Sequence, residues 1–230
     1  MILSINQPAY LPWPGYFDRI ARSDLHVVLD HVQFEKNSFV NRNQILGKGG
    51  PFWLTVPVRT KGRFGNLPIS EVEIDQSSTW QRKHLQSIRS AYGKSPHFDE
   101  YWGPLEGILS TEFLKLNDLC RATTGPLLGM LGIDVECRYS SSHEFGCSKG
   151  DLVLEICREF GASTYLSGPF GREYLDLDSF SEAGIEVQFH DFVPERYAQP
   201  ATEFTGNLSV IDMLFNVGAS SRFFFPGKHR

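Results

Sequence analysis

Polar side chains gather after the second apolar stretch of the chain, where they are suited to bind a small anionic molecule. Asp30 ends that stretch, and Gln33, Asn41, Arg42 and Asn43 follow closely. An arginine can hold a phosphate or carboxylate at two points, while asparagine amides orient hydroxyl groups. Asp30 is a candidate general base. The alternative is a polar loop whose asparagines satisfy only their own backbone.

The first apolar stretch ends in a loop that offers an amide and aromatic faces. Gln7 and Tyr10 are candidate substrate contacts, because an amide beside aromatic rings suits a sugar or a nucleobase. In the alternative, Tyr10, Leu11 and Trp13 fold back into the core, which is common for tryptophan. We expect Gln7 in the site and Trp13 in the core.

A glycine-containing turn follows a short apolar stretch later in the chain. Ser167, Gly168 and Arg172 are candidate substrate contacts, since such a turn can direct backbone N–H groups at an anion. The Gly-Lys-Ser/Thr core of a phosphate-binding P-loop is missing. A tight strand-to-helix turn explains the same residues equally well.

His84 is the candidate histidine for proton transfer or anion contact, beside Arg82 and Lys83 on a predicted helix. A histidine on the helix surface is the alternative. A metal site or a Cys–His nucleophile would require His143 with Cys147, or His190 with Asp191, and no standard motif supports either. We therefore predict no metal site, and the sequence identifies no cofactor.

The elements that must position these residues form a β-α-β unit. Apolar residues predict strands near residues 2–5 and 25–29, with a helix near 16–21 between them, and the two strands would be parallel. Ligands of open parallel sheets bind outside the carboxyl ends of the strands. We therefore expect the 7–15 loop and the 30–43 segment to converge over a common hollow.

Strands and helices alternate through the rest of the chain, which predicts a single α/β domain over residues 1–230 with a mostly parallel sheet flanked by helices. Residues 77–132 form an all-helical insertion or cap, in which Pro126 should kink or divide a helix over 111–131. Residues 69–74 alternate as a half-exposed strand. Ser209 and Asp212 approximate a capping box, and with Asn207 they could border the pocket.

The composition and the overall charge indicate which classes of protein to exclude. A net charge of -5 and a pI near 5.8 argue against a nucleic-acid-binding protein. Four irregularly spaced cysteines suggest reduced thiols, and no secretory signal or membrane span is recognisable, so we expect a cytoplasmic protein. The Phe223–Phe225 run could mediate homo-oligomer contacts or dock into its own core.

Several segments together resemble the WbqC-like protein family across about residues 2–218. The family is associated with bacterial surface-polysaccharide (O-antigen) synthesis, so the resemblance implies a pathway more than a reaction. The segments that carry it are QPAYLPWPGYFDRIARSD, HVQF, NRNQI, WLTVPV, WQRKHL, TYLSGPFGREYLD and NLSVIDMLFNVG.

The sequence and the resemblance favour an enzyme of polysaccharide precursor synthesis that transfers an acyl or aminoacyl group to an amino sugar or sugar nucleotide. Arg42 and Arg172 would hold phosphate or carboxylate, and Asp30 or His84 would take the amine proton. One alternative is a non-catalytic sugar- or nucleotide-binding accessory protein. Another is a nucleotidylyltransferase-like, ATP-dependent amide-forming enzyme, although the His-x-x-His pair of that fold is missing.

Overall fold

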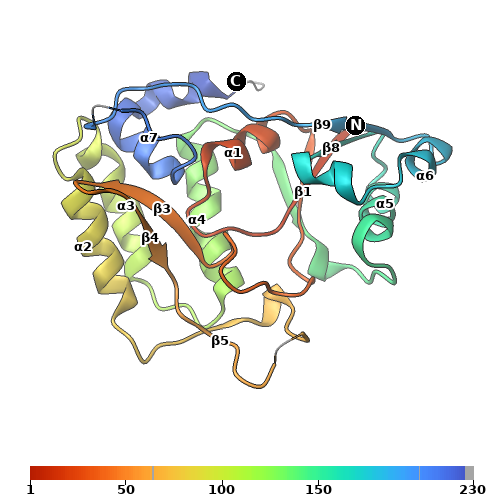
Figure 1. Cartoon of the computed structure of the whole chain (residues 1–230), viewed down its shortest axis with the longest axis horizontal. Helices are drawn as coiled ribbons and strands as arrows, with labels where there is room; N and C mark the ends of the chain where they lie inside the picture. The colour runs from red at the N-terminus through yellow and green to blue at the C-terminus, as the bar shows by residue number, and fades with distance from the viewer. Residues whose placement is uncertain (64, 202, 226–230) are drawn as a thin grey trace.

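A parallel sheet forms the centre of the molecule (Figure 1). The computed structural model describes residues 1–63, 65–201 and 203–225. The sheet has five strands in the order β7-β2-β1-β8-β9, and each neighbouring pair is parallel. The strands are β1 (Ile2–Asn6), β2 (Leu25–Val28), β7 (Glu136–Tyr139), β8 (Thr164–Ser167) and β9 (Glu186–Phe189). The predicted α/β class is confirmed.

The strand order reverses at β1, which lies at the middle of the sheet. The chain moves outward from β1 to β2 and β7, then returns to the other side of β1 to form β8 and β9. In doubly wound sheets, the crevice at such a reversal point is the usual ligand site. Here that crevice lies between the loop after Asn6 and the loop after Ser167.

The predicted β-α-β unit consists of β1, α1 (Pro14–Ala21) and β2. Pro14 lies in the first turn of α1, where its fixed φ suits a helix and its missing N–H is not needed. Tyr16, Phe17 and Ile20 are buried. Beneath the helix, the Ser4 hydroxyl on β1 forms a hydrogen bond with His26 on β2 at 2.9 Å, which joins the two strands. The same hydroxyl forms a second hydrogen bond with the Ser23 hydroxyl at 2.8 Å.

The opposite face of the sheet packs against α5 (Lys149–Glu159) and α6 (Leu177–Glu182). Side chains alternate between the faces of a strand, so Leu3 and Ile5 point away from Ser4 and join this second cluster. Cys157 and Phe180 complete its centre. The central strands are therefore covered on both faces, as a parallel sheet requires.

A β-hairpin and four helices form the larger part of the core with α1. Figure 1 shows the hairpin with α2 and α3 beside it, at the end of the molecule away from α6. The helical block predicted over 77–132 is present as α2, α3 and α4; its description as a cap stays a prediction. The elements are β3 (Arg42–Gly47), β4 (Gly50–Thr55), α2 (Trp80–Tyr92), α3 (Phe98–Ser110), α4 (Leu116–Met130) and α7 (Val210–Val217).

Three local predictions were wrong in detail. The alternating 69–74 segment begins as a 3-10 turn, Ile69–Glu71, and only Glu73–Ile74 (β6) pairs, with Val58–Arg59 (β5). Helix α4 starts at Leu116 instead of residue 111 and runs through Pro126 undivided, because buried leucines hold the turns on both sides; a kink at Pro126 stays a prediction. Ser209 precedes α7 without a side-chain cap.

The Phe223–Phe225 run divides between the core and the surface. Phe225 is buried with 1% of its surface exposed, whereas Phe223 is 72% exposed. Across residues 1–63, 65–201 and 203–225, no helix combines the length and apolar character needed to cross a membrane. All four cysteines are free thiols.

Candidate functional site at the reversal point of the sheet

A cavity of about 540 Å³ opens at the carboxyl ends of β1 and β8, and we call it the switch-point cleft. Asn6 and Gln7 line it after β1, Gly168 lines it after β8, and Arg19 reaches it from α1. Small-molecule sites commonly measure roughly 300–1,000 Å³ and combine apolar walls with a few polar groups. The cleft fits that description in position, size and lining.

Arg19 supplies the positive charge of the cleft. It donates a hydrogen bond to Oδ1 of Asn6, and its buried Nε has no partner within the described ranges. Burial lowers the pKa of Arg19, and the neighbours that oppose this shift are Tyr165, Tyr16 and Tyr174, none of them a carboxylate. A guanidinium that faces a cavity without a carboxylate partner is suited to hold an anion.

Gly168 allows Arg19 to approach the backbone after β8. A Cβ atom added at Gly168 would lie 2.3 Å from an Nη atom of Arg19, so the flexible end of the arginine would have to move away. The absence of a side chain at residue 168 therefore sets the position of the guanidinium.

Aromatic rings form much of the remaining wall of the cleft, together with the aliphatic residues Ile5, Leu29 and Val153. Trp13 and Phe39 stand on one side with their ring centres 4.8 Å apart, and Phe170 and Tyr174 line the cleft after β8. Phe170 is 73% exposed and Tyr174 is 48% exposed, so these rings are not required by the core. Exposed aromatic faces beside a cation suit a ligand with a ring and a negative group.

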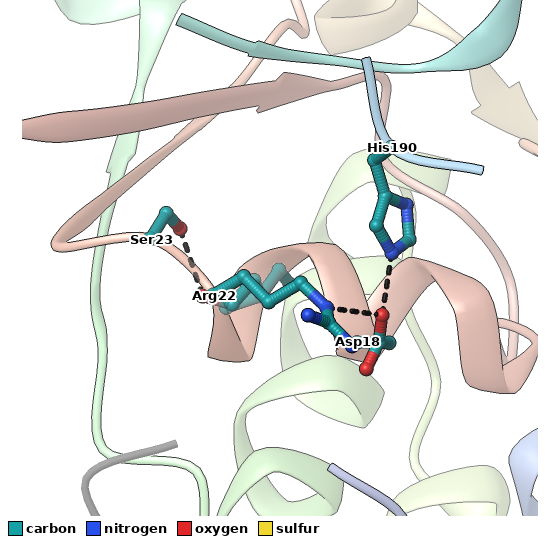
Figure 2. A network of polar contacts seen from close by, with 5 residues as sticks. Asp18, Arg22, Ser23 and His190 are labelled. Carbon is teal, nitrogen blue, oxygen red and sulfur yellow. Dashed lines mark hydrogen bonds and ion pairs between the residues drawn. The ribbon is translucent and has the colours of Figure 1, made fainter. Parts of the chain in front are cut away.

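His190 closes the cleft beside β9 and is held by Asp18 of α1. Figure 2 shows Nε2 of His190 and Nε of Arg22 approaching the same carboxylate oxygen. The His190 and Asp18 side chains are 9% and 3% exposed. Burial by itself would raise the pKa of Asp18, but the hydrogen bonds from His190 and Arg22 hold it below its ordinary value.

A second cavity of about 600 Å³ lies on the other side of this histidine, and we call it the neighbouring cavity. Asp18, Arg22 and Gln188 line it. His190, Phe192 and Asn207 line both cavities. The segment after β9 therefore forms a wall between the two spaces.

Asp30 lies at the end of β2 with both carboxylate oxygens occupied. Oδ1 accepts hydrogen bonds from the Ser140 hydroxyl and the Ser141 backbone N–H, at 3.1 and 2.8 Å. Oδ2 accepts from the Ser141 hydroxyl and the Asn117 amide, both at 2.8 Å. These contacts tie β2 to the end of β7 and to α4; a catalytic role for Asp30 stays a prediction.

His84 is a buried histidine on α2. Its Nδ1 lies 2.9 Å from the hydroxyl of Tyr10, which is itself fully buried. Burial lowers the pKa of His84 to about 4, so its ring is neutral at physiological pH. The pair joins the loop after β1 to α2 inside the core, and neither residue lines the switch-point cleft.

The Asn41–Asn43 element braces the backbone around it. The Asn41 amide donates to the Val56 carbonyl at 2.9 Å, and the Asn43 amide donates to the Leu11 carbonyl at 2.6 Å. Arg42 lies over the Trp53 ring at 4.2 Å, with its buried Nε unpartnered within the described part of the chain. Gln33 bonds the Phe34 and Leu67 backbones.

The two predicted loops do meet, through hydrogen bonds from Asn43 to Leu11 and from Tyr10 to Phe39 and through aromatic rings. Phe39 packs between Trp13 and Trp53, and Arg42 lies against Trp53. Trp13, which we expected in the core, is a partly buried residue that packs against the hydrophobic core and also lines the cleft. Asn41, Arg42 and Asn43 are not among the described residues that line the cleft.

Of the three substrate contacts predicted in the turn after β8, one lines the cleft and two do not. Gly168 lines the cleft, whereas Ser167 is fully buried and its hydroxyl donates to the Gly168 carbonyl at 3.1 Å. Arg172 is exposed and forms a two-point ion pair with Asp191, at 2.9 and 2.8 Å. Of the substrate contacts predicted from sequence, Gln7 and Gly168 therefore line the cleft.

Sequence reasoning missed Arg19, Asn6 and His190. Arg19 follows Gly15 by four residues on one helix face, and His190 directly follows the alternating strand Glu186–Phe189, so local signals existed. His190 pairs with Asp18 of α1, whereas Asp191, its neighbour in sequence, pairs with Arg172. Within the described residues, no group of three or more His, Cys, Asp or Glu side chains could hold a metal ion.

The residues that line the cleft from Gln7 onward lie within a region shared with other sequences. The sequence profile of the WbqC-like protein family matches residues 7–223. The uncharacterized protein Rv1507c of Mycobacterium tuberculosis is 35% identical over 221 residues, which cover 95% of each chain. No solved structure matches the chain.

Proposed function

The chain belongs to the WbqC-like protein family, and we propose that it binds a phosphorylated sugar, such as a sugar nucleotide, in the switch-point cleft. Family membership suggests involvement in polysaccharide-related biosynthesis. In this proposal the protein acts in the cytoplasm on a precursor of a surface polysaccharide of the O-antigen type.

The observation that carries the proposal is the position of Arg19. Its guanidinium faces the cleft at the reversal point of the sheet, bonded to Asn6 and free of any carboxylate among the described residues. A phosphate group would supply the missing negative charge and two acceptor oxygens. Gln7 is exposed at the rim and is available to a sugar hydroxyl.

The aromatic walls support a ligand that carries rings. Trp13, Phe39, Phe170 and Tyr174 line the same cleft as Arg19. A sugar or nucleobase can lie against such faces while its phosphate contacts Arg19. The reaction we propose is acyl or aminoacyl transfer to an amino sugar or its nucleotide, which forms an amide.

Binding of defined anions tests the role of Arg19. We expect uridine diphosphate sugars or inorganic pyrophosphate to bind in calorimetry. The Arg19→Gln variant should bind on the order of ten- to hundredfold more weakly, since a charge-assisted hydrogen bond contributes about 1.5–3 kcal/mol. Arg172→Gln is the matched control, because its partner Asp191 already neutralises it. If only the Arg172→Gln variant binds more weakly, the anion binds at the 167–172 turn predicted from sequence and not at Arg19.

A non-catalytic binding role is the second candidate, and one observation favours it. Asp30 and His84, the catalytic residues expected from sequence, are both engaged in hydrogen bonds within the protein. Incubation with amino-sugar nucleotides and acyl donors, followed by mass spectrometry, separates the two roles. A ligand-bound protein that forms no amide product would support the accessory role.

A further inference from the structure

His190 is the one histidine among the described residues that lines both the switch-point cleft and the neighbouring cavity. Its backbone N–H donates to the Ser167 carbonyl at 2.8 Å, which fixes the start of the segment after β9 beside β8. Its ring stacks on Phe192, with the ring centres 6.2 Å apart. Phe192 in turn packs against Gly15, where an added Cβ would lie 2.7 Å from the phenylalanine ring.

The carboxylate of Asp18 determines which nitrogen of His190 carries hydrogen. Asp18 is kept ionised by His190 and Arg22, despite a burial that opposes ionisation. An ionised carboxylate only accepts hydrogen bonds, so the ring nitrogen that faces it, Nε2, must donate. In the neutral ring, Nδ1 then carries a lone pair. Within the described chain, no hydrogen bond is made to Nδ1.

We propose that His190 is the general base of the reaction, with Asp18 as its positioning residue and Nδ1 as the proton acceptor. The inference deepens the proposed function and depends on it for the identity of the phosphorylated ligand. The switch-point cleft holds that ligand on Arg19, and the neighbouring cavity admits the second reactant. His190, in the wall that both spaces share, contacts the attacking amino group.

The step is attack of an amino group on an activated acyl donor, a thioester or an acyl phosphate. The nitrogen lone pair forms the bond to the acyl carbon, and the bond from that carbon to the thiolate or phosphate breaks with its electron pair. The N–H bond breaks with its electron pair left on nitrogen, and the proton moves to Nδ1, forms an imidazolium ring and then passes to the leaving group. Asp18 stabilises that cation through the hydrogen bond at Nε2, while Arg22 keeps the carboxylate in place. The charged groups around the ring are Asp18 and Arg22 of α1, Arg19 in the switch-point cleft, Glu195 in the neighbouring cavity, and Asp191 with its partner Arg172.

Chemical modification tests the lone pair without knowledge of the substrate. Diethyl pyrocarbonate acylates an unprotonated imidazole nitrogen, and peptide mapping by mass spectrometry identifies the modified histidine. We expect His190 to react in the folded protein, and uridine diphosphate or pyrophosphate to slow that reaction. His97, whose side chain is 38% exposed, is the internal control for reagent activity.

The Asp18→Asn variant tests the positioning role. The asparagine oxygen can still accept from both Nε2–H of His190 and Nε–H of Arg22, so the tautomer is kept while the negative charge that stabilises the imidazolium is removed. We expect an unchanged tautomer in nitrogen-15 spectra of the imidazole rings and an unchanged rate of His190 modification, but about a tenfold lower kcat with any substrate that is acylated. An unreactive His190 in the wild-type protein, or a hydrogen on its Nδ1, would overturn the proposal.

Turnover separates this inference from the proposed function. With any amino-sugar nucleotide that is acylated, His190→Gln should bind within about threefold of wild type and lose on the order of a hundredfold or more in kcat. An equal loss of binding in His190→Gln and Arg19→Gln would make His190 a ligand contact and refute the base. If no anion binds the wild type, the proposed function fails, while the modification experiment still decides the state of Nδ1.

Discussion

Two polar regions lie at the ends of strands in this sheet, and they use their side chains differently. At the end of β2, Asp30 accepts four hydrogen bonds from the chain itself, and nearby Asn43 and Gln33 bond backbone groups. At the ends of β1 and β8, Arg19 faces a cavity with its Nε unpaired.

The difference teaches that the number of polar residues is a poor guide to a binding site. Buried polar groups that bond one another hold segments together, because breaking those bonds inside the protein is costly. A cation with free donors at a cavity has that capacity left for a ligand. The same contrast separates Arg172, which pairs with Asp191, from Arg19.

The largest expected effect is on stability at the end of β2. Asp30→Ala leaves the donors of Ser140, Ser141 and Asn117 without their acceptor, and we expect a loss of about 3 kcal/mol in the free energy of unfolding. Urea denaturation measures it, with Ser141→Ala as the milder control at about 1 kcal/mol. An Asp30→Ala variant that keeps its full stability but loses turnover would instead support a catalytic role for Asp30.

A smaller effect concerns the pH dependence of stability at His84. The unfolded residue takes up a proton near pH 6.5, but the folded one does so only near its lowered pKa of about 4. Stability is therefore complete above pH 6.5 and falls as the pH drops towards 4, by about 2 kcal/mol at pH 5 from this residue.

The His84→Gln variant should lack that contribution while an amide still reaches the Tyr10 hydroxyl. Between pH 7.5 and pH 5, its free energy of unfolding should fall by about 2 kcal/mol less than that of the wild type. Buried His26, whose pKa is lowered to about 3, contributes to the pH dependence of both proteins. Identical pH profiles would contradict a neutral, structural His84.

The smallest expected effect sharpens the description of the cleft. Gly168→Ala keeps an ordinary extended backbone, with φ of -70°, but its methyl group displaces the Arg19 guanidinium. We expect about tenfold weaker pyrophosphate binding, equal to about 1.4 kcal/mol, at nearly unchanged stability. Gly103→Ala on α3 meets no atom within 4 Å and is the control. Unchanged pyrophosphate binding in the Gly168→Ala variant would contradict the role of the Arg19 guanidinium as the anion contact.

The local pattern of apolar and polar residues was sufficient to predict much of the fold and part of the lining of the cleft. The apolar stretches around Leu3 and Val27, with the helix of Phe17 and Ile20 between them, predicted the β-α-β unit correctly. The rule that ligands lie beyond strand ends located Gln7, and the glycine-containing turn after a short strand indicated Gly168. The capping box at Ser209 failed because Asp212 is drawn to the Tyr197 hydroxyl and the Gln199 amide, both outside the helix.

The amino-acid sequence by itself determined the α/β class and the elements of the sheet, because the period of apolar residues reports which face of an element is buried. Only the tertiary structure decided that β8 lies beside β1, which brings Gly168 to Arg19 and His190 to Asp18. Those contacts join residues more than a hundred positions apart. Their pairing depends on strand order and crossover packing, which no local pattern encodes.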